Sequence, residues 1–151
     1  MATATDFYPY LLEGVAKEKV WGGRNLETRV GKTLPPDRLI GETWEAWDGC
    51  RILNGPHRGR TFGELLAQFP GEILGEAAQG GPRFPLLLKF LDAQDDLSIQ
   101  VHPDDKQAQE MEHYPYGKTE AWYILYAAPD GSIIHGFNAE VERATILQKL
   151  S

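Results

Sequence analysis

The chain has 151 residues, which is the length of one ordinary domain and enough to bury a core. Its 15 basic and 22 acidic residues leave a net charge of −7, which argues against nucleic acid and anionic membranes as partners. The first ten residues lack a basic segment followed by an apolar one, and no apolar run approaches the length of a membrane span, so we expect a cytoplasmic protein.

Glycine and proline divide the chain into short segments. The 16 glycines and 10 prolines are scattered along it, which favours a β-rich fold over a bundle of long helices. The single cysteine, Cys50, can form neither an internal disulfide nor a Cys-rich zinc site, and we expect it to pack as a small apolar side chain. No repeat or linker interrupts the chain, so we expect a single domain over residues 1–151.

The first half of the chain predicts short elements, because apolar alternation and turn residues change every few positions. In chain order they are an irregular segment through about residue 36 with a turn at 21–24, a strand at 40–47, a turn at 48–49, a short strand at 51–53, helical segments at 62–68 and 72–78, and a loop at 79–82. The strand at 40–47 places Glu42 and Trp44 on one face and Glu45 on the other. Thr61 and Glu64 form a capping box at the start of the first helix.

The second half predicts longer and more regular elements. In chain order they are an apolar strand at 84–91, an alternating strand at 97–102, a helix from Pro103 to about Glu112, a loop at 114–117, strands at 119–126 and 132–137 joined by a turn at 128–131, and a helix at 140–150. Pro103 suits the first position of its helix, and Asp104 and Asp105 suit the helix dipole there.

A row of polar side chains on two of these strands is the candidate site. A period of two puts Ser98, Gln100 and His102 on one face, and Lys118 and Glu120 share a face of the next strand. If the two strands are neighbours, an amide oxygen, an imidazole nitrogen and a carboxylate oxygen converge, and such a set suits Zn²⁺ and other divalent ions. The alternative is an ordinary half-buried strand whose polar face meets water, and the spacing alone does not decide between the two.

The motifs around this row resemble a known family. Gln-Val-His-Pro at 100–103, followed by Gly-Lys-Thr-Glu-Ala-Trp at 117–122, resembles the signature of type I mannose-6-phosphate isomerase (phosphomannose isomerase), of the cupin superfamily. Further segments occur in the family's order, and the resemblance runs from about Tyr8 to Phe137; these segments are 21–23, 40–45, 84–92 and 97–105. The resemblance implies a mainly β, cupin-like jelly-roll barrel with short helices, incomplete at its C-terminal end.

The resemblance also implies a metal site that this chain does not complete. The family binds one divalent ion, usually zinc, through a Gln, a Glu and two His residues, and by motif three of these fall on Gln100, His102 and Glu120. The motif that carries the second His is not found, because His135 lies on the strand that directly follows the Glu120 strand. The family's downstream Arg that contacts the substrate is not found either. The chain therefore resembles the N-terminal portion of a longer enzyme, and we expect either truncation or a partner chain that completes the fold.

The implied activity is the interconversion of mannose 6-phosphate and fructose 6-phosphate through an enediol intermediate. In the family, residues at the positions of Lys89, Ser98 and Lys118 line the substrate pocket, and Trp21 is placed to stack on sugar. Plain structural interpretations exist as well: Lys89 reaching to the surface, Lys118 exposed at a strand start, and Trp21 packing in a core or loop. Glu45 is a candidate general base if its strand reaches the pocket, and a solvated carboxylate otherwise.

Three functions are open at this point. They are a metal-dependent isomerase, a non-catalytic cupin fragment that binds metal or sugar weakly because the fourth ligand is absent, and a β-rich interaction domain without metal. Metal content separates the third from the other two, and turnover separates the first from the second. His57 and His113 lie in polar segments, and we expect both to be solvated.

Overall fold

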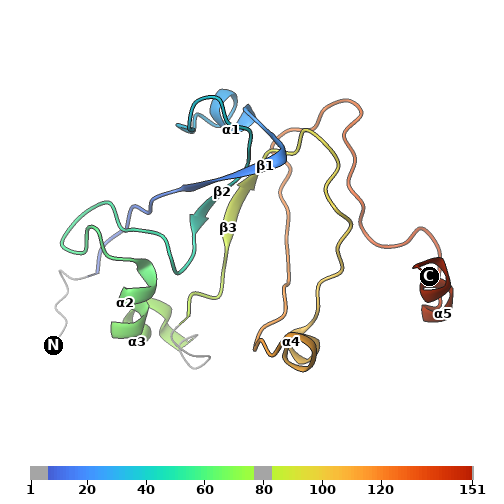
Figure 1. Ribbon diagram of the computed structural model, residues 1–151. Helices are drawn as coiled ribbons and strands as arrows, with labels where there is room; N and C mark the ends of the chain where they lie inside the picture. Colours follow the sequence, from blue (N-terminus) through green and yellow to red (C-terminus); the bar gives the residue numbers. More distant parts are fainter. Residues whose placement is uncertain (1–6, 77–82, 151) are drawn as a thin grey trace. The chain divides into compact units, whose positions relative to one another are not determined.

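The computed structural model describes residues 7–76 and 83–150 of the chain (Figure 1). By its internal packing the chain divides into an N-terminal unit, residues 1–97, and a C-terminal unit, residues 98–151, and each is described by itself. The predicted loop at 79–82 and the end of the predicted helical segment at 72–78 lie outside the described residues. Among the described residues, no helix combines the length and the apolar character needed to cross a membrane.

An antiparallel sheet of three strands is the centre of the N-terminal unit (Figure 1). The strands are β1 (Val15–Gly23), β2 (Ile40–Ala46) and β3 (Leu88–Leu91), and β2 lies between the other two. The predicted strand at 40–47 is therefore confirmed. The predicted strand at 84–91 is confirmed only in its last four residues.

Strand β1 corrects the prediction that the N-terminal segment is irregular. Its sequence, VAKEKVWGG, is interrupted by charged residues, and Val20 is almost fully exposed, so no apolar alternation announces a strand. The strand forms because its backbone pairs with β2, with Ala16 opposite Thr43. This pairing joins residues far apart in sequence, which local pattern does not report.

The predicted turn at 21–24 is wrong for its first three residues, which form the end of β1, and glycine is needed there because β1 and β2 approach each other closely. A β-carbon on Gly22 would lie 2.4 Å from the backbone nitrogen of Gly41, so only glycine fits there. A β-carbon on Gly41 would in turn lie 2.6 Å from the ring of Trp21. The Trp21 ring therefore packs over the glycine of β2.

The four-residue helix α1 (Asn25–Thr28) depends on a buried carboxylate far along the chain. Asp92 is 5% exposed and accepts hydrogen bonds from the backbone nitrogen of Asn25 at 2.7 Å, from its side-chain nitrogen at 3.1 Å, and from Gln94. Leu26 on this helix packs with Leu34 and Ile40 in one small core. The sequence did not predict α1, because so short a helix has no periodicity and its partner lies 67 positions away.

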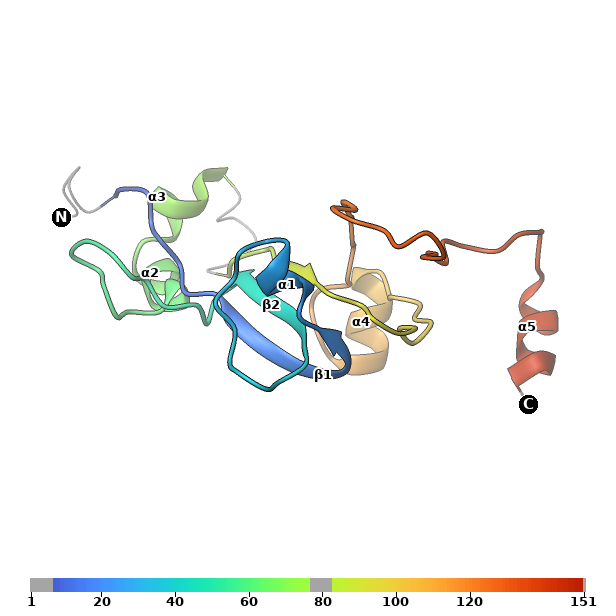
Figure 2. The same ribbon diagram turned by 90° about the horizontal axis from the view of Figure 1, so that it is seen from above.

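Two short helices pack side by side next to a second small core (Figure 2). Helix α2 (Phe62–Gln68) has the predicted bounds and the predicted capping box, with Thr61 and Glu64 joined by hydrogen bonds of 2.9 and 3.2 Å. Helix α3 (Pro70–Leu74) starts on a proline. Cys50 is fully buried against α2, and burial raises the pKa of its thiol, so it packs as a small apolar group as predicted.

His57 is only partly exposed, whereas the sequence predicted a solvated side chain. Its ring stacks on Tyr8 with a centroid distance of 6.1 Å, and the rings of Tyr10 and Phe69 lie 6.3 and 6.4 Å away. Its Nε2 atom is buried without a hydrogen-bond partner among the described residues. The surrounding polar sequence predicts exposure, but aromatic side chains from distant segments lie beside the ring. The nearby predicted strand at 51–53 forms only isolated bridges, which join Leu12 to Ile52 and Arg51 to Thr61.

Two helices are the regular elements of the described part of the C-terminal unit. Helix α4 (Asp105–Glu112) starts later than predicted because Asp104 caps it: Asp104 accepts from the Gln107 backbone at 2.8 Å, and Gln107 accepts from the Asp104 backbone at 3.2 Å. It ends at His113, which adopts the left-handed conformation and is exposed as predicted. Helix α5 (Arg143–Leu150) also starts later than predicted.

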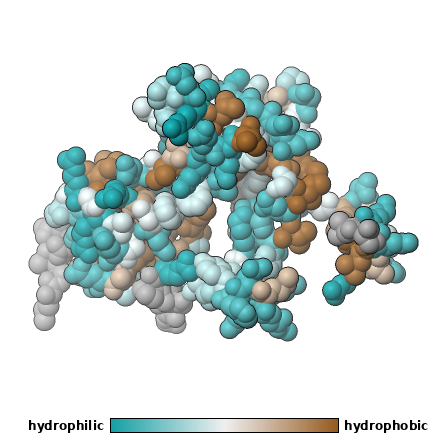
Figure 3. Space-filling view, in the orientation of Figure 1, coloured by the Kyte–Doolittle hydropathy of each residue, from teal (hydrophilic) through white to brown (hydrophobic). Residues whose placement is uncertain are grey.

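The predicted strands at 97–102, 119–126 and 132–137 do not form ladders in the described part of the chain. Figure 1 draws the chain on both sides of α4 as coil. Large apolar side chains in these segments are exposed, among them Val101 at 90% and Tyr123 at 87%, and Figure 3 shows apolar side chains at the surface. A strand needs a neighbouring backbone, and no described segment supplies one here. The predicted turn at 128–131 is present, and the backbone nitrogen of Gly131 donates to the carbonyl of Ala128 at 2.9 Å.

Candidate metal and substrate site

Two of the three predicted metal ligands meet in the C-terminal unit. The Nε2 atom of His102 lies 3.2 Å from the Oε2 atom of Glu120, although 18 positions separate the two residues. Their side chains are 24% and 27% exposed, so the pair is partly shielded and still open to water. The convergence that the sequence predicted is therefore present, without the sheet that was expected to produce it.

Helix α4 and the loop after it bring the two residues together. The backbone nitrogen of Gly117 donates to the Asp105 carboxylate at 2.7 Å, and that of Lys118 donates to the Pro103 carbonyl at 3.1 Å. A β-carbon on Gly117 would lie 2.4 Å from the same carbonyl, so glycine is required for this approach. These contacts bring the chain after α4 back to the residues beside His102.

The ammonium group of Lys118 lies against both members of the pair. Its Nζ atom is 2.7 Å from Oε1 of Glu120 and 3.1 Å from Nε2 of His102. The hydrogen bond from Lys118 lowers the pKa of Glu120; burial opposes this shift, while hydrogen bonding to Trp122 and the charge of His102 assist it. Glu120 is therefore an anion at neutral pH.

The third predicted ligand, Gln100, makes a different contact. Its side-chain nitrogen donates to the hydroxyl of Ser98 at 2.7 Å, and both residues are exposed. Within the described residues, no hydrogen bond links Gln100 to His102 or Glu120. The structure thus assembles two of the three predicted ligands.

The pair of donors fits a divalent cation. Two ligands that bind a tetrahedral zinc ion at 2.0–2.2 Å lie roughly 3.3 Å apart, close to the His102–Glu120 separation. The cationic Nζ of Lys118 lies against the same two side chains, 3.1 Å from Nε2 of His102 and 2.7 Å from Oε1 of Glu120. Among the described residues, no group of three or more His, Cys, Asp or Glu side chains is placed to hold a metal, so further donors would have to be amide or external oxygens.

Lys89 belongs to a half-buried network in the N-terminal unit. It lies on β3 directly opposite Trp44 on β2, and its ammonium is 3.2 Å from Oε1 of Glu42. The indole of Trp44 donates to Oε2 of Glu42 at 2.7 Å, so both carboxylate oxygens have partners. The side chains of Lys89 and Glu42 are 20% and 11% exposed. Lys89 is therefore held by an ion pair on the sheet.

Glu42 is a residue that the sequence reasoning missed. Burial raises the pKa of Glu42, but the Trp44 hydrogen bond and the Lys89 charge together outweigh burial, and the pKa is lowered. The available signal was the lysine inside the apolar run at 84–91, since a lysine in such a strand needs a partner. The partner of Lys89 comes from the face of β2 that was predicted to carry Glu42 and Trp44.

Glu45, the candidate base, lies on the opposite face of β2. It pairs with Lys32 at 2.5 Å and is 16% exposed, and the Lys32 ammonium lies 5.0 Å from the centre of the Phe90 ring. The expectation of a solvated carboxylate is therefore wrong. The other carboxylate oxygen of Glu45, Oε1, is buried without a hydrogen-bond partner among the described residues.

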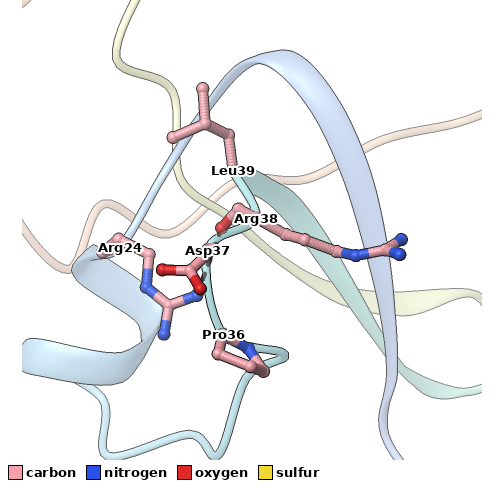
Figure 4. A pocket seen from close by; sticks show the side chains of 5 residues that line it. All are labelled: Arg24, Pro36, Asp37, Arg38 and Leu39. Atoms are coloured by element: carbon pink, nitrogen blue, oxygen red, sulfur yellow. Dashed lines mark hydrogen bonds between the residues drawn. The ribbon is translucent and has the colours of Figure 1, made fainter.

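A surface pocket in the N-terminal unit contains none of the predicted site residues; it is lined by Arg24, Pro36, Asp37, Arg38 and Leu39 (Figure 4). Arg24 donates to Glu27 and to two backbone carbonyls, while Arg38 pairs with Glu18 at 3.0 Å. Figure 4 shows the Arg38 side chain directed away from the guanidinium of Arg24. Both guanidinium groups serve the protein's own contacts, so this pocket is no anion site.

Comparison with known proteins places these features in a family. Residues 10–125, which include every predicted site residue, match the model of the phosphomannose isomerase type I catalytic domain. Mannose-6-phosphate isomerase ManA of Bacillus subtilis is 40% identical over 147 residues, covering 93% of this chain and 45% of ManA. Mannose-6-phosphate isomerase of Streptococcus mutans is 38% identical over 136 residues, covering 87% of this chain and 42% of that protein.

Solved structures support the fold. The crystal structure of the Bacillus subtilis mannose 6-phosphate isomerase matches with a TM-score of 0.63 and 41% identity, over 72% of this chain and 35% of that one. A mutant phosphomannose isomerase from Salmonella typhimurium shares the fold with a TM-score of 0.60 at 23% identity. These neighbours have the cupin fold, so the chain is a protein of the cupin class and the predicted fold class is confirmed. The chain belongs to the type I phosphomannose isomerase family. It spans 42–45% of the length of the curated relatives that it matches.

Proposed function

We propose that this chain provides the N-terminal, metal- and substrate-binding part of an enzyme that interconverts mannose 6-phosphate and fructose 6-phosphate. The observation that carries the proposal is the convergence of His102 and Glu120 within the stretch that matches the family's catalytic domain. The matched proteins of Bacillus subtilis and Streptococcus mutans are mannose-6-phosphate isomerases by name, which supports mannose 6-phosphate as a substrate.

The reaction moves a proton between C2 and C1 of the sugar through an enediol intermediate. Its difficulty is the weak acidity of the carbon that carries the proton. A bound divalent ion, which we propose is Zn²⁺, supplies stabilisation for the negative charge that develops on the sugar oxygens. In this chain His102 and Glu120 would hold the ion, and the Gln100 amide would join them after releasing Ser98.

The phosphorylated substrate requires hydrogen-bond donors, preferably of positive charge. Lys118 and Lys89 supply ammonium groups and Ser98 supplies a hydroxyl, and we propose each of them as a substrate-binding residue. Glu42 orients Lys89 through its ion pair. Trp21, which is partly exposed, is proposed to contact the sugar. Glu45 is not proposed as the general base, because its carboxylate is largely buried in an ion pair with Lys32.

Further polypeptide, either a C-terminal half or a partner chain, is proposed to complete the protein. The segments after α4 expose many large apolar side chains, and exposed apolar surface of this kind marks contact sites. They are Trp122, Tyr123, Ile124, Leu125, Tyr126, Ile133, Ile134 and Phe137. The reaction is proposed to take place in the cytoplasm, where the lone thiol of Cys50 stays reduced.

A second candidate function is a non-catalytic cupin fragment that binds metal or sugar weakly. It is favoured by the two assembled ligands, where a structural or catalytic zinc site ordinarily has three or more protein ligands. In this case the chain alone binds the ion and does not turn over the sugar.

A coupled assay tests the proposal. The chain is stripped of metal, reloaded with Zn²⁺, and assayed for conversion of mannose 6-phosphate to fructose 6-phosphate, with His102→Ala as the matched control. Zn²⁺-dependent turnover that is lost in the control supports the isomerase. Stoichiometric Zn²⁺ binding without turnover supports the fragment. Zn²⁺ binding that is equal in wild type and His102→Ala contradicts the site.

A further inference from the structure

We propose that Lys118 is a positioning residue that occupies the cation position between His102 and Glu120 while the metal is absent, and that it leaves this position when the metal binds. This inference rests on the proposed metal site. It assigns Lys118 a role in metal uptake that precedes any contact with substrate.

The contacts of the Lys118 ammonium show that it uses the atoms a metal would use. Nζ contacts Nε2 of His102 at 3.1 Å and Oε1 of Glu120 at 2.7 Å. The nitrogen and the oxygen that face the ammonium are donor atoms of the two candidate ligands. A metal ion bound by these side chains would lie about 2.0–2.2 Å from such atoms. Two cations cannot lie so close to the same atoms at once, so ammonium and metal exclude each other at this pair.

The separation of the two candidate ligand atoms gives a second reason for a shared cation. Nε2 of His102 and Oε2 of Glu120 lie only 3.2 Å apart, close to the spacing of two ligands on one divalent ion. Among the described residues, Lys118 places a positive charge against both side chains, as a bound metal ion would.

The Lys118 side chain can move away from the pair at low free-energy cost. It is 47% exposed, whereas the side chain of Lys89, the other lysine proposed to bind substrate, is 20% exposed and held on the sheet. An exposed ammonium group on a flexible four-carbon chain is readily hydrated, so breaking its contacts costs little free energy. The freed charge is then available to the anionic group of the substrate. Metal binding and anion binding therefore reinforce each other, and the coupling acts equally in both directions.

The first test measures Zn²⁺ affinity by competition with a chromophoric chelator. Lys118→Met is compared with Lys106→Met, which removes the same charge from a site in α4 that is 81% exposed and 3.9 Å from Glu110. We expect Lys118→Met to bind Zn²⁺ roughly tenfold more tightly than wild type, since one charge-assisted competitor is removed. Lys106→Met should match wild type. Circular dichroism confirms that both variants keep the wild-type fold.

The second test separates displacement from simple charge repulsion. The amines are labelled with acetic anhydride with and without Zn²⁺, and the labelling rate of each lysine is read by peptide mass spectrometry. Displacement predicts that Zn²⁺ increases labelling of Lys118 and leaves Lys106 unchanged. Repulsion alone predicts tighter binding by Lys118→Met with no change in labelling, and that result overturns the inference.

The two tests also distinguish this inference from the proposed function. If wild type binds Zn²⁺ through His102 but Lys118→Met binds no more tightly, only the role of Lys118 is refuted. If neither wild type nor Lys118→Met binds Zn²⁺ at a one-to-one ratio, the metal site itself is refuted and this inference with it.

Discussion

Breaking the ion pair between Lys89 and Glu42 should destabilise the N-terminal unit by a measurable amount. Lys89→Met keeps most of the aliphatic stem and removes the ammonium that lies 3.2 Å from the Glu42 carboxylate. Removing one partner of a fully buried pair costs about 3–5 kcal/mol, and an exposed pair is worth about 0–1 kcal/mol. This pair is 20% and 11% exposed, and Trp44 continues to satisfy one oxygen of Glu42. We therefore expect a loss of about 2 kcal/mol.

The assay is urea unfolding followed by tryptophan fluorescence, which yields the free energy of unfolding for wild type, Lys89→Met, Glu42→Gln and the double variant. Because the two side chains contact each other, the double variant should lose less than the sum of the single variants, by about 1–2 kcal/mol. Lys106→Met, which breaks a long and exposed pair, should stay within about 0.5 kcal/mol of wild type. A Lys89→Met variant as stable as the Lys106→Met control would refute the reasoning, as would strictly additive losses.

Other predictions concern the sheet, the buried aspartate, pH and the metal ligands. Asp92→Ala leaves the amide of Asn25 without its acceptor and should cost about 2–4 kcal/mol in urea unfolding, while exposed Asp96→Ala should be neutral. Gly22→Ala forces a β-carbon onto the backbone of β2 and should cost about 1–3 kcal/mol, whereas Gly71→Ala in α3, with open space around it, should not destabilise. Because the pKa of Glu42 is lowered in the folded protein, its ionised carboxylate stabilises the fold at pH values above the ordinary glutamate pKa, and this stabilisation is lost as the pH falls through the lowered pKa. The decrease in the free energy of unfolding on acidification should therefore be smaller for Glu42→Gln than for wild type. Glu120→Ala should abolish one-to-one Zn²⁺ binding by equilibrium dialysis, and retention of bound metal would sink the ligand assignment.

Local chemistry accounts for the elements that the sequence predicted correctly. Strand β2 alternates within its own residues, so its two faces were readable, and Glu42 and Glu45 indeed make their contacts on opposite sides. Helix α2 begins at a capping box whose members are three positions apart. Helix α4 uses the same device with Asp104 and Gln107, which the sequence analysis overlooked in favour of Pro103. Such signals lie within a few residues and need no partner from elsewhere.

At the candidate site the sequence predicted the proximity of two residues correctly but the secondary structure around them wrongly. Strand alternation predicted that His102 and Glu120 converge, and they do, but a helix excursion closed at Gly117 brings them together in place of paired strands. Gln100, expected on the same face, instead bonds Ser98. Alternation places side chains on a common face only when the backbone is held in a ladder, and residues 97–102 have no ladder partner in the described chain.

The sequence by itself determined the family, the short helices with their caps, the faces of the central strand and the pair of candidate ligands, because each depends on residues that are close in the chain or on motifs in a set order. Only the tertiary structure decided the rest. Strand β1 exists through pairing with β2, α1 is held by Asp92, and the ring of His57 lies beside distant aromatic residues. For Lys89 the sequence signals only that a lysine in an apolar run needs a partner, and the structure identifies that partner as Glu42, 47 positions away. In the other cases the stabilising partner is remote in sequence, and the local pattern does not report it.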